Sequence, residues 1–147
     1  MKITLNEILT KLGEHLKSEH LKLSSQREEI LGIFYNSGKH LTAEELYDIC
    51  RESVPNLGIA TIYRALKLFC RIGICKEIFI DNGITRYEIS DDKNHHDHLI
   101  CTKCGMFVEI ISPEIEKIQN KISYAHGFDL VDHRLNLYGI CPQCRKK

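Results

Sequence analysis

The sequence predicts an α+β protein of two small domains: a winged helix-turn-helix over residues 1–90 and an α/β domain over residues 91–147. Two observations carry this prediction. Apolar repeats of helical spacing in the first part are followed by two short apolar segments on either side of Asn82-Gly83, which is the element order of a winged helix. The second part contains two Cys-x-x-Cys pairs, a pattern typical of a metal site in a small α/β domain.

Composition narrows the class of protein. No apolar run approaches the roughly 18 residues of a membrane span, and the first 20 residues lack the apolar core of a signal peptide. We therefore expect a cytoplasmic protein with no membrane partner. Lys and Arg number 20, as do Asp and Glu, so the net charge is zero. Any surface for nucleic acid must then come from where the charges point, because phosphate neutralisation dominates such binding.

Three helices are expected before residue 58. The first has an apolar face with helical spacing, formed by Leu5, Ile8, Leu9, Leu12 and Leu16. Ser24 or Ser25 can begin the second, and Ser25 with Glu28 fits a capping box. Thr42 and Glu45 form a further capping box at the start of the third helix.

The helix expected over residues 58–72 has two chemically different faces. Its apolar face is Ile59, Ile62, Leu66, Phe69 and Cys70, and its other face is Ala60, Arg64, Lys67 and Arg71, with Tyr63 at the border. A helix that reads the major groove needs such cations, so Tyr63, Arg64 and Lys67 are candidate DNA contacts. The alternative is an ordinary solvated face. The hairpin expected over residues 75–80 and 84–89 favours DNA binding.

A short polar connection, residues 90–94, precedes the second domain. Strands are expected over residues 99–101 and 107–111, on either side of the first cysteine pair. Ser112-Pro113 begins a helix that ends at Gly127, after which residues 128–138 are extended. The expected buried stripe of this helix is Ile115, Ile118, Ile122 and Ala125.

Cys101, Cys104, Cys141 and Cys144 form two matched pairs that can complete a closed, tetrahedral zinc site. A redox-active pair and plain buried cysteines are the alternatives. Cys50 and Cys70 lie on apolar stripes and are interpreted as core residues, and Cys75 is expected to have no partner nearby.

The segment His95-His96-Asp97-His98 is a second candidate metal-binding motif. In an extended chain, alternate side chains point to opposite faces, which predicts two metal sites rather than one. A solvated polar loop is the alternative. Further candidate ligands, each by itself an ordinary polar residue, are His40, Glu88, Glu109, Glu116, His126 and His133.

The segments GIATIYRAL (58–66), HHDHLICTKCG (95–105) and LYGICPQC (137–144) resemble the ferric uptake regulator family, and the resemblance covers nearly the whole chain. It implies a winged helix joined to a dimerisation domain, and a repressor that binds AT-rich inverted repeats of double-stranded DNA when loaded with a divalent metal. It also implies control of metal uptake genes. The family resemblance implies a homodimer, and assembly to a tetramer stays open.

The resemblance also assigns residues. It implies that the four cysteines hold structural zinc (Zn2+). The regulatory site between the domains matches His40, Glu88, His96, His98 and Glu109. A further site matches His95, Asp97, Glu116 and His133, whereas His126 matches no ligand position. Tyr63 and Arg64 match base-reading positions, and Lys22 matches a residue that reaches the minor groove.

Iron(II) (Fe2+) is the favoured regulatory metal because the ligands are nitrogen and carboxylate oxygen without thiolate, although Mn2+ and Zn2+ suit the same donors. Glu109 stands where peroxide sensors of the family carry aspartate, which disfavours peroxide sensing. Gly58 and Met106 depart from residues common in the family. An enzyme is disfavoured, since the sequence lacks a His-Glu-x-x-His motif and a phosphate-binding glycine loop. A metallohydrolase and a protein-binding zinc scaffold are the alternatives from other classes.

Overall fold

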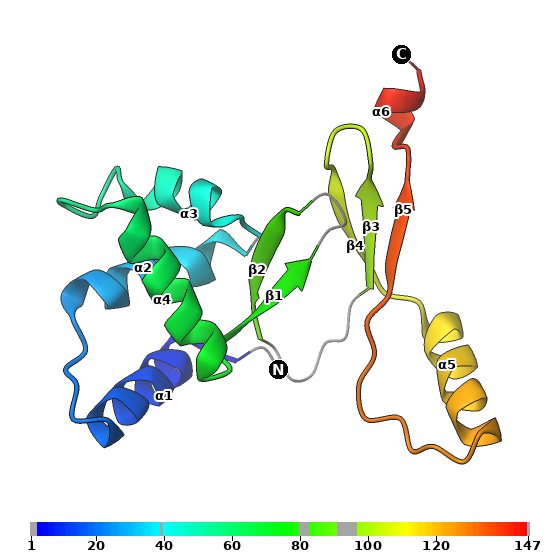
Figure 1. Cartoon of the computed structure of the whole chain (residues 1–147), viewed down its shortest axis with the longest axis horizontal. Helices are drawn as coiled ribbons and strands as arrows, with labels where there is room; N and C mark the ends of the chain where they lie inside the picture. The colour runs from blue at the N-terminus through cyan, green and yellow to red at the C-terminus, as the bar shows by residue number, and fades with distance from the viewer. Residues whose placement is uncertain (1–2, 39, 80–82, 91–96, 147) are drawn as a thin grey trace. The chain divides into compact units, whose positions relative to one another are not determined.

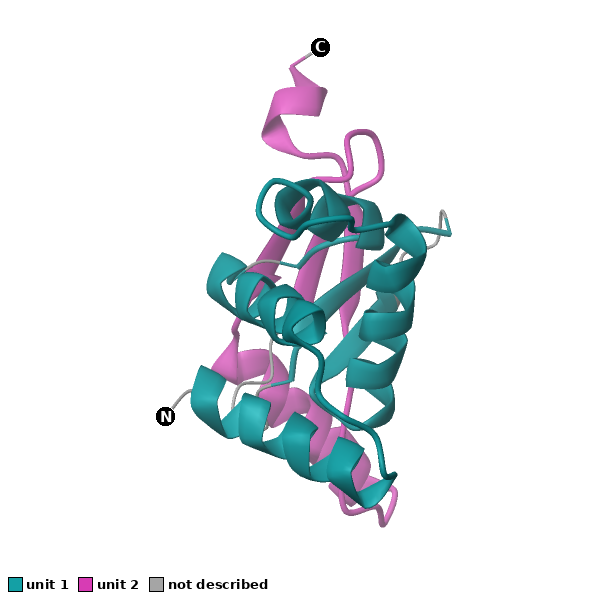
Figure 2. Ribbon diagram, turned by 90° about the vertical axis from the view of Figure 1, so that its left-hand side faces the viewer, with its two compact units in different colours: residues 1–93 teal, residues 94–147 magenta. Residues whose placement is uncertain are grey.

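The computed structural model describes residues 3–38, 40–79, 83–90 and 97–146. The chain divides into two compact units, Met1–Lys93 and Asn94–Lys147, which are distinguished by colour in Figure 2. Most of the connection that was predicted over residues 90–94, and the Asp81-Asn82 part of the predicted turn, lie outside the described residues. None of the described helices is long and apolar enough to cross a membrane.

Unit 1 contains four helices followed by a hairpin (Figure 1). The helices are α1 (Leu5–Ser18), α2 (Ser25–Ser37), α3 (Ala43–Cys50) and α4 (Ile59–Arg71). Strand β1 (Cys75–Phe79) pairs with β2 (Thr85–Ile89) in antiparallel register. The element order is the predicted one, so the winged helix-turn-helix is confirmed.

Helix starts follow side-chain caps. The predicted box at α3 is present: Glu45 N donates to Thr42 Oγ1 (3.1 Å) and Thr42 N donates to Glu45 Oε2 (2.9 Å). The box predicted from Ser25 and Glu28 is wrong. Ser24 caps α2 by accepting from the amide of Arg27 (3.3 Å), and an arginine at this third position has no acceptor to complete a box.

The core of unit 1 is formed by all four helices and the base of the hairpin. Its fully buried side chains include Leu12, Leu16, Ile30, Phe34, Leu46, Ile62, Leu66 and Phe69. On α4 the predicted apolar face is correct for its last three turns, whereas Ile59 is 37% exposed. Ile59 is the first residue of the helix, one residue after its cap, so its side chain lies at the margin of the core.

Unit 2 is built on a three-stranded sheet in the order β4-β3-β5. Strand β3 (Asp97–Cys101) is central, antiparallel to β4 (Phe107–Ile110) and parallel to β5 (Asn136–Gly139). Helix α5 (Pro113–Ala125) lies between β4 and β5 in the chain, and the short α6 (Pro142–Arg145) follows β5. Ser112 caps α5 by accepting from the amide of Ile115 (3.4 Å), as predicted.

The buried stripe predicted for α5 is wrong. No residue of this helix is buried; Ile118 is 57% exposed and Ile122 is 56% exposed. Helical periodicity identifies an apolar face but does not show what covers it. Among the described residues of this chain, none covers the apolar face of α5.

The interpretation of Cys75 as unpartnered is also wrong, since its Sγ lies 3.0 Å from that of Cys70.

The burial of α4 predicts its mutational sensitivity. Leu66→Ala removes a fully buried side chain and leaves a cavity, so we expect the free energy of unfolding to fall by about 2–5 kcal/mol. Lys67→Ala, at the adjacent exposed position, is the control and should change it by less than about 0.5 kcal/mol. Urea unfolding followed by circular dichroism measures both. Equal effects of the two substitutions would contradict the observed orientation of α4.

Candidate metal centres and recognition surface

The two cysteine pairs meet at one end of the unit 2 sheet. Cys101 ends β3, and the register of β3 with β5 pairs Cys101 with Gly139, two residues before Cys141. The turn after the first pair contains Gly105 in the left-handed conformation (φ +74°), which favours glycine. The Sγ atoms of all four cysteines lie within 4.8 Å of one another. Four thiols gathered in this way fit a closed tetrahedral zinc site.

Hydrogen bonds within the cysteine cluster shift the pKa values of its thiols. The amide of Cys141 donates to Cys101 Sγ at 3.3 Å, and this bond, with others from the first turn, lowers the pKa of the Cys101 thiol to about 6. Hydrogen bonds with Cys141 and Cys104 raise the pKa of Cys144 to about 12. Without an ion the cluster therefore holds at least one proton, which a metal must displace to bind.

A second cluster in unit 2 combines one imidazole with two carboxylates. His133 Nε2 lies 3.1 Å from Glu116 Oε1 and 3.5 Å from Asp97 Oδ1. Asp97 begins β3, Glu116 lies in the first turn of α5, and His133 precedes β5, so three segments converge here. One nitrogen and two carboxylate oxygens can bind a divalent cation. His95, the fourth residue predicted for this site, lies outside the described residues.

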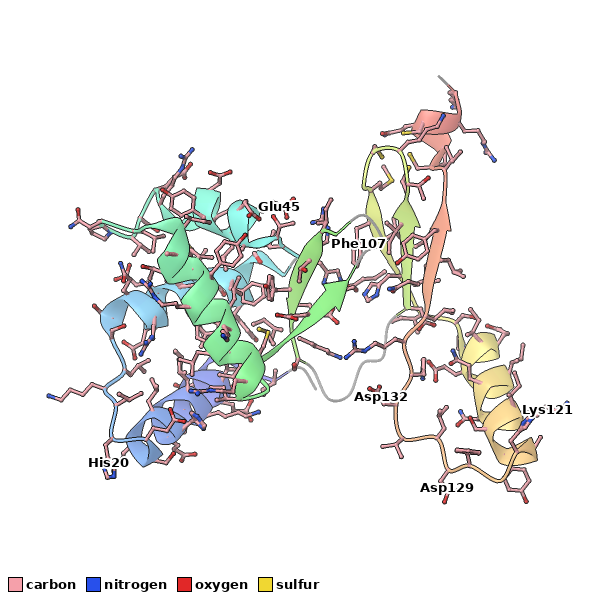
Figure 3. The ribbon with its side chains drawn as sticks, in the orientation of Figure 1. His20, Glu45, Phe107, Lys121, Asp129 and Asp132 are labelled. Carbon is pink, nitrogen blue, oxygen red and sulfur yellow. The ribbon has the colours of Figure 1, made fainter. Side chains whose placement is uncertain are left out.

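In unit 1, His40 and Glu88 lie side by side, with His40 Nδ1 3.1 Å from Glu88 Oε2. Backbone pairing brings them together: Leu41 N donates to Tyr87 O (3.1 Å) and Tyr87 N to Leu41 O (2.8 Å). Arg86 strengthens the junction by donating to His40 O (3.1 Å) and to Glu45 Oε2 (3.0 Å). Glu45, which is labelled in Figure 3, lies in the first turn of α3.

In unit 2, His98 and Glu109 are direct partners across the β3–β4 register. The Nδ1 atom of His98 lies 3.3 Å from Asn136 Oδ1 on β5, and its ring packs on Phe107 with centroids 4.6 Å apart. Contacts of this kind orient an imidazole so that Nε2 can serve as a ligand. His96, predicted beside them, lies outside the described residues. His126 is different: it caps α5 and contacts the carbonyl of Ile122 (2.9 Å), which suits an ordinary polar residue.

The polar face of α4 is exposed, as its sequence predicts. Tyr63 is 46% exposed, and Arg64 and Lys67 are exposed on the same helix. Lys22, between α1 and α2, is also exposed. One contact escaped the sequence interpretation: the Tyr63 hydroxyl donates to Glu44 at the start of α3, and this bond lowers the pKa of Glu44. The pair lies 19 residues apart, beyond any local pattern.

Comparison with known proteins agrees with this architecture. Residues 18–138 match the model of the ferric uptake regulator family. The ferric uptake regulation protein of Neisseria meningitidis serogroup A is 41% identical over 133 residues, covering 90% of this chain and 92% of that protein. The solved ferric uptake regulator of Helicobacter pylori, described as having three functional metal-binding sites, matches with a TM-score of 0.91 and 34% identity, over 100% of this chain and 98% of that one.

A solved zinc-bound manganese uptake regulator also matches, with a TM-score of 0.73 and 40% identity, over 95% of this chain and 99% of that one. A winged helix-turn-helix joined to a unit that carries a four-cysteine cluster and further potential metal ligands defines a metal-responsive transcription regulator. The chain belongs to the ferric uptake regulator family.

The cysteine cluster predicts a dependence of unit 2 on bound zinc. Cys104→Ser removes one of the four sulfur ligands, so we expect the purified protein to lose most of its zinc and the strands of unit 2 to lose amide-exchange protection. Cys50→Ser, in the core of unit 1, should keep the zinc. Metal analysis and hydrogen exchange measure the two effects. Full zinc content in Cys104→Ser would contradict the assignment.

Proposed function

We propose that this protein is a transcriptional repressor that binds AT-rich inverted-repeat operators as a homodimer when it is loaded with iron(II), and so controls metal uptake genes. It acts in the cytoplasm as a regulator and not as an enzyme. The proposal rests on one combination of features. Unit 1 exposes cationic side chains on α4, and each unit contains a His–carboxylate pair, His40 with Glu88 in unit 1 and His98 with Glu109 in unit 2.

Unit 1 supplies the DNA contacts. Arg64 and Lys67 project from α4 on the side opposite its buried residues, and Tyr63 lies exposed at the border of that side, so a major groove can accept them without disturbing the core. Arginine reads guanine edges, and lysine neutralises phosphate. Lys22 reaches the adjacent minor groove in this proposal. The chain as a whole is neutral, so affinity depends on this local arrangement of cations.

The regulatory metal takes its ligands from both units: His40 and Glu88 from unit 1, and His96, His98 and Glu109 from unit 2. Imidazole nitrogen and carboxylate oxygen without thiolate suit iron(II). An ion shared in this way favours the dimer geometry in which both recognition helices reach successive major grooves. It can do so only through its higher affinity for that state, which makes the metal a corepressor.

The other two clusters have supporting roles in the proposal. Cys101, Cys104, Cys141 and Cys144 hold structural zinc. A further divalent ion binds to Asp97, Glu116 and His133, with His95, and so links β3, α5 and the segment before β5. The ion at Asp97 stabilises the end of the unit 2 sheet that lies opposite the cysteines, because Asp97 begins β3 and Cys101 ends it.

Unit 2 is also the proposed dimerisation domain. Large apolar side chains are exposed along α5 and the segment that follows it: Ile118, Ile122, Tyr124, Phe128 and Val131. Exposed apolar patches of this kind mark association surfaces. A two-fold dimer formed through them presents two copies of α4, which matches the symmetry of an inverted repeat.

The central test is anaerobic fluorescence anisotropy on an AT-rich inverted-repeat duplex, with zinc retained on the cysteines and iron(II), manganese(II) or zinc(II) added separately. We expect tight binding with iron(II) that chelation reverses. His98→Ala should abolish the metal-dependent increase, and Arg64→Ala should weaken the metal-loaded complex by about tenfold or more. Lys121→Ala, which removes an exposed cation from α5, is the control and should bind as the wild type does.

Each outcome of this test has a distinct meaning. Binding driven by manganese or zinc in place of iron would keep the mechanism and change the signal. Binding that is indifferent to every metal would contradict metal control. Unchanged affinity of Arg64→Ala would contradict the recognition face on α4.

The exposed face of α5 predicts the oligomeric state. Ile122→Glu places a charge in the apolar patch, so we expect the mass in solution, measured by light scattering after size exclusion, to fall from two chains to one. Lys121→Glu, at the neighbouring position of the same helix, is the matched control and should remain dimeric. A dimer that survives Ile122→Glu would place the interface elsewhere.

A further inference from the structure

Two cysteines outside the zinc cluster face each other where the recognition helix meets the wing. Cys70 lies in the last turn of α4 and Cys75 is the first residue of β1. Their Sγ atoms are 3.0 Å apart, about 1 Å more than a disulfide bond of ~2.05 Å. The intervening turn is closed by a hydrogen bond from Ile74 N to Phe69 O (2.8 Å), and Gly73 adopts a φ of +73° within it. The folded turn itself therefore brings the sulfurs together.

The two thiols differ in environment. Cys70 is half-buried, whereas Cys75 is 3% exposed and its Sγ also lies 3.8 Å from the carbonyl of Leu66, an acceptor for its proton. The hydrogen bond between the sulfurs lowers the pKa of Cys70 and raises that of Cys75. Cys70 is thus the better nucleophile and the more accessible one, and Cys75 is placed to react after it.

We propose that Cys70 and Cys75 form an oxidisable dithiol, which hydrogen peroxide converts into a disulfide between the recognition helix and the wing. In the first step the Cys70 thiolate attacks a peroxide oxygen, the O–O bond breaks, and the products are a sulfenic acid and, after protonation of hydroxide, water. In the second step the Cys75 sulfur attacks the Cys70 sulfur, and the hydroxyl leaves as water with the Cys75 proton. Two thiols lose two electrons, and one peroxide gains them.

Cys50 provides an internal contrast. It lies in the same unit but is fully buried, and burial raises the pKa of its thiol to about 11. A buried, protonated thiol is inert toward peroxide. Reactivity in unit 1 therefore belongs to the Cys70–Cys75 pair, and it is chemically separate from the four cysteines of unit 2.

A disulfide at this place acts on the DNA-reading element directly. It would fix the end of α4 to β1 across a turn of four residues, Arg71 to Ile74. Arg71, next to Cys70, already binds Glu19 beyond the end of α1 through an ion pair of 3.1 Å. In the oxidised state, the helix that carries Tyr63 and Arg64 is therefore held at its end by two bonds: the disulfide to β1 and the ion pair with Glu19.

The test uses the full-length, zinc-loaded protein without iron, treated with hydrogen peroxide, blocked with an alkylating agent and digested with trypsin. Trypsin cleaves after Lys67, Arg71 and Lys76, so each cysteine falls in its own peptide, 68–71 and 72–76. We expect these two peptides to appear linked, two hydrogen atoms lighter than the separate thiol forms. Cys50 should remain alkylated and the zinc content unchanged at the dose that links them.

Two variants test the order of the steps. In Cys75→Ser the sulfenic acid has no thiol to resolve it, so a dione probe should label Cys70. In Cys70→Ser the same probe should leave Cys75 unlabelled. The proposal is overturned if wild-type Cys70 and Cys75 stay alkylatable at doses that oxidise the zinc cysteines, or if the linked peptides come only from cross-linked dimers on a non-reducing gel.

Discussion

The described part of unit 2 buries almost no apolar side chains, and the other features of this unit depend on that constraint. Among its described residues, Ile100 and Cys101 are the buried apolar side chains, whereas unit 1 buries about twenty. A domain of this size cannot offset the conformational entropy of folding with so little burial. Its stability must come from bonds to ions and from association with another chain. The four thiols and the Asp97–Glu116–His133 cluster can hold ions, and the exposed apolar face of α5 can associate with another chain.

In unit 1, α4 is a core element and also carries the exposed cationic face to which the proposed function assigns DNA recognition. The helix separates the two tasks by face: Ile62, Leu66 and Phe69 are fully buried, and the cations lie on the opposite side. Contacts at its edges then fix its position. Tyr63 binds Glu44 on α3, and Arg71 pairs with Glu19 after α1. Acidic residues near α4 thus fix its position.

Sequence reasoning succeeded where the cause is local and failed where it is not. The helix order, the Thr42–Glu45 box and the hairpin follow from spacing within about ten residues. The box expected at Ser25 failed by one residue, because two adjacent serines offer equally good caps and only the tertiary structure selects Ser24. The Cys70–Cys75 contact depends on the exact path of a turn that no pattern of alternating apolar residues encodes. The sequence predicted the apolar face of α5 correctly. It could not predict what covers this face, because the second chain of the proposed dimer leaves no pattern in the sequence around the helix.

The contact between His40 and Glu88 is the clearest case of long-range dependence. It spans 48 positions and exists because Leu41 pairs with Tyr87, one residue from each ligand. Thr42 and Glu45 form the capping box at the start of α3, and Arg86 binds both Glu45 and the His40 carbonyl. Because α3 packs on α4, the regulatory ion proposed at His40 and Glu88 would act on the anchor of α3.

The donor atoms suit the two tasks proposed for the metal sites, which are to keep one metal and to respond to another. Four thiolates form a closed site with no open position, and an ion that binds there displaces the proton that the raised pKa of Cys144 retains. Imidazole and carboxylate donors bind divalent ions more weakly and with less selectivity. In the proposed function, zinc is accordingly retained as part of the fold, while the His–carboxylate pairs exchange ions with the surroundings. Under this proposal, separate donor chemistry, rather than separate domains, divides structural from sensory metal.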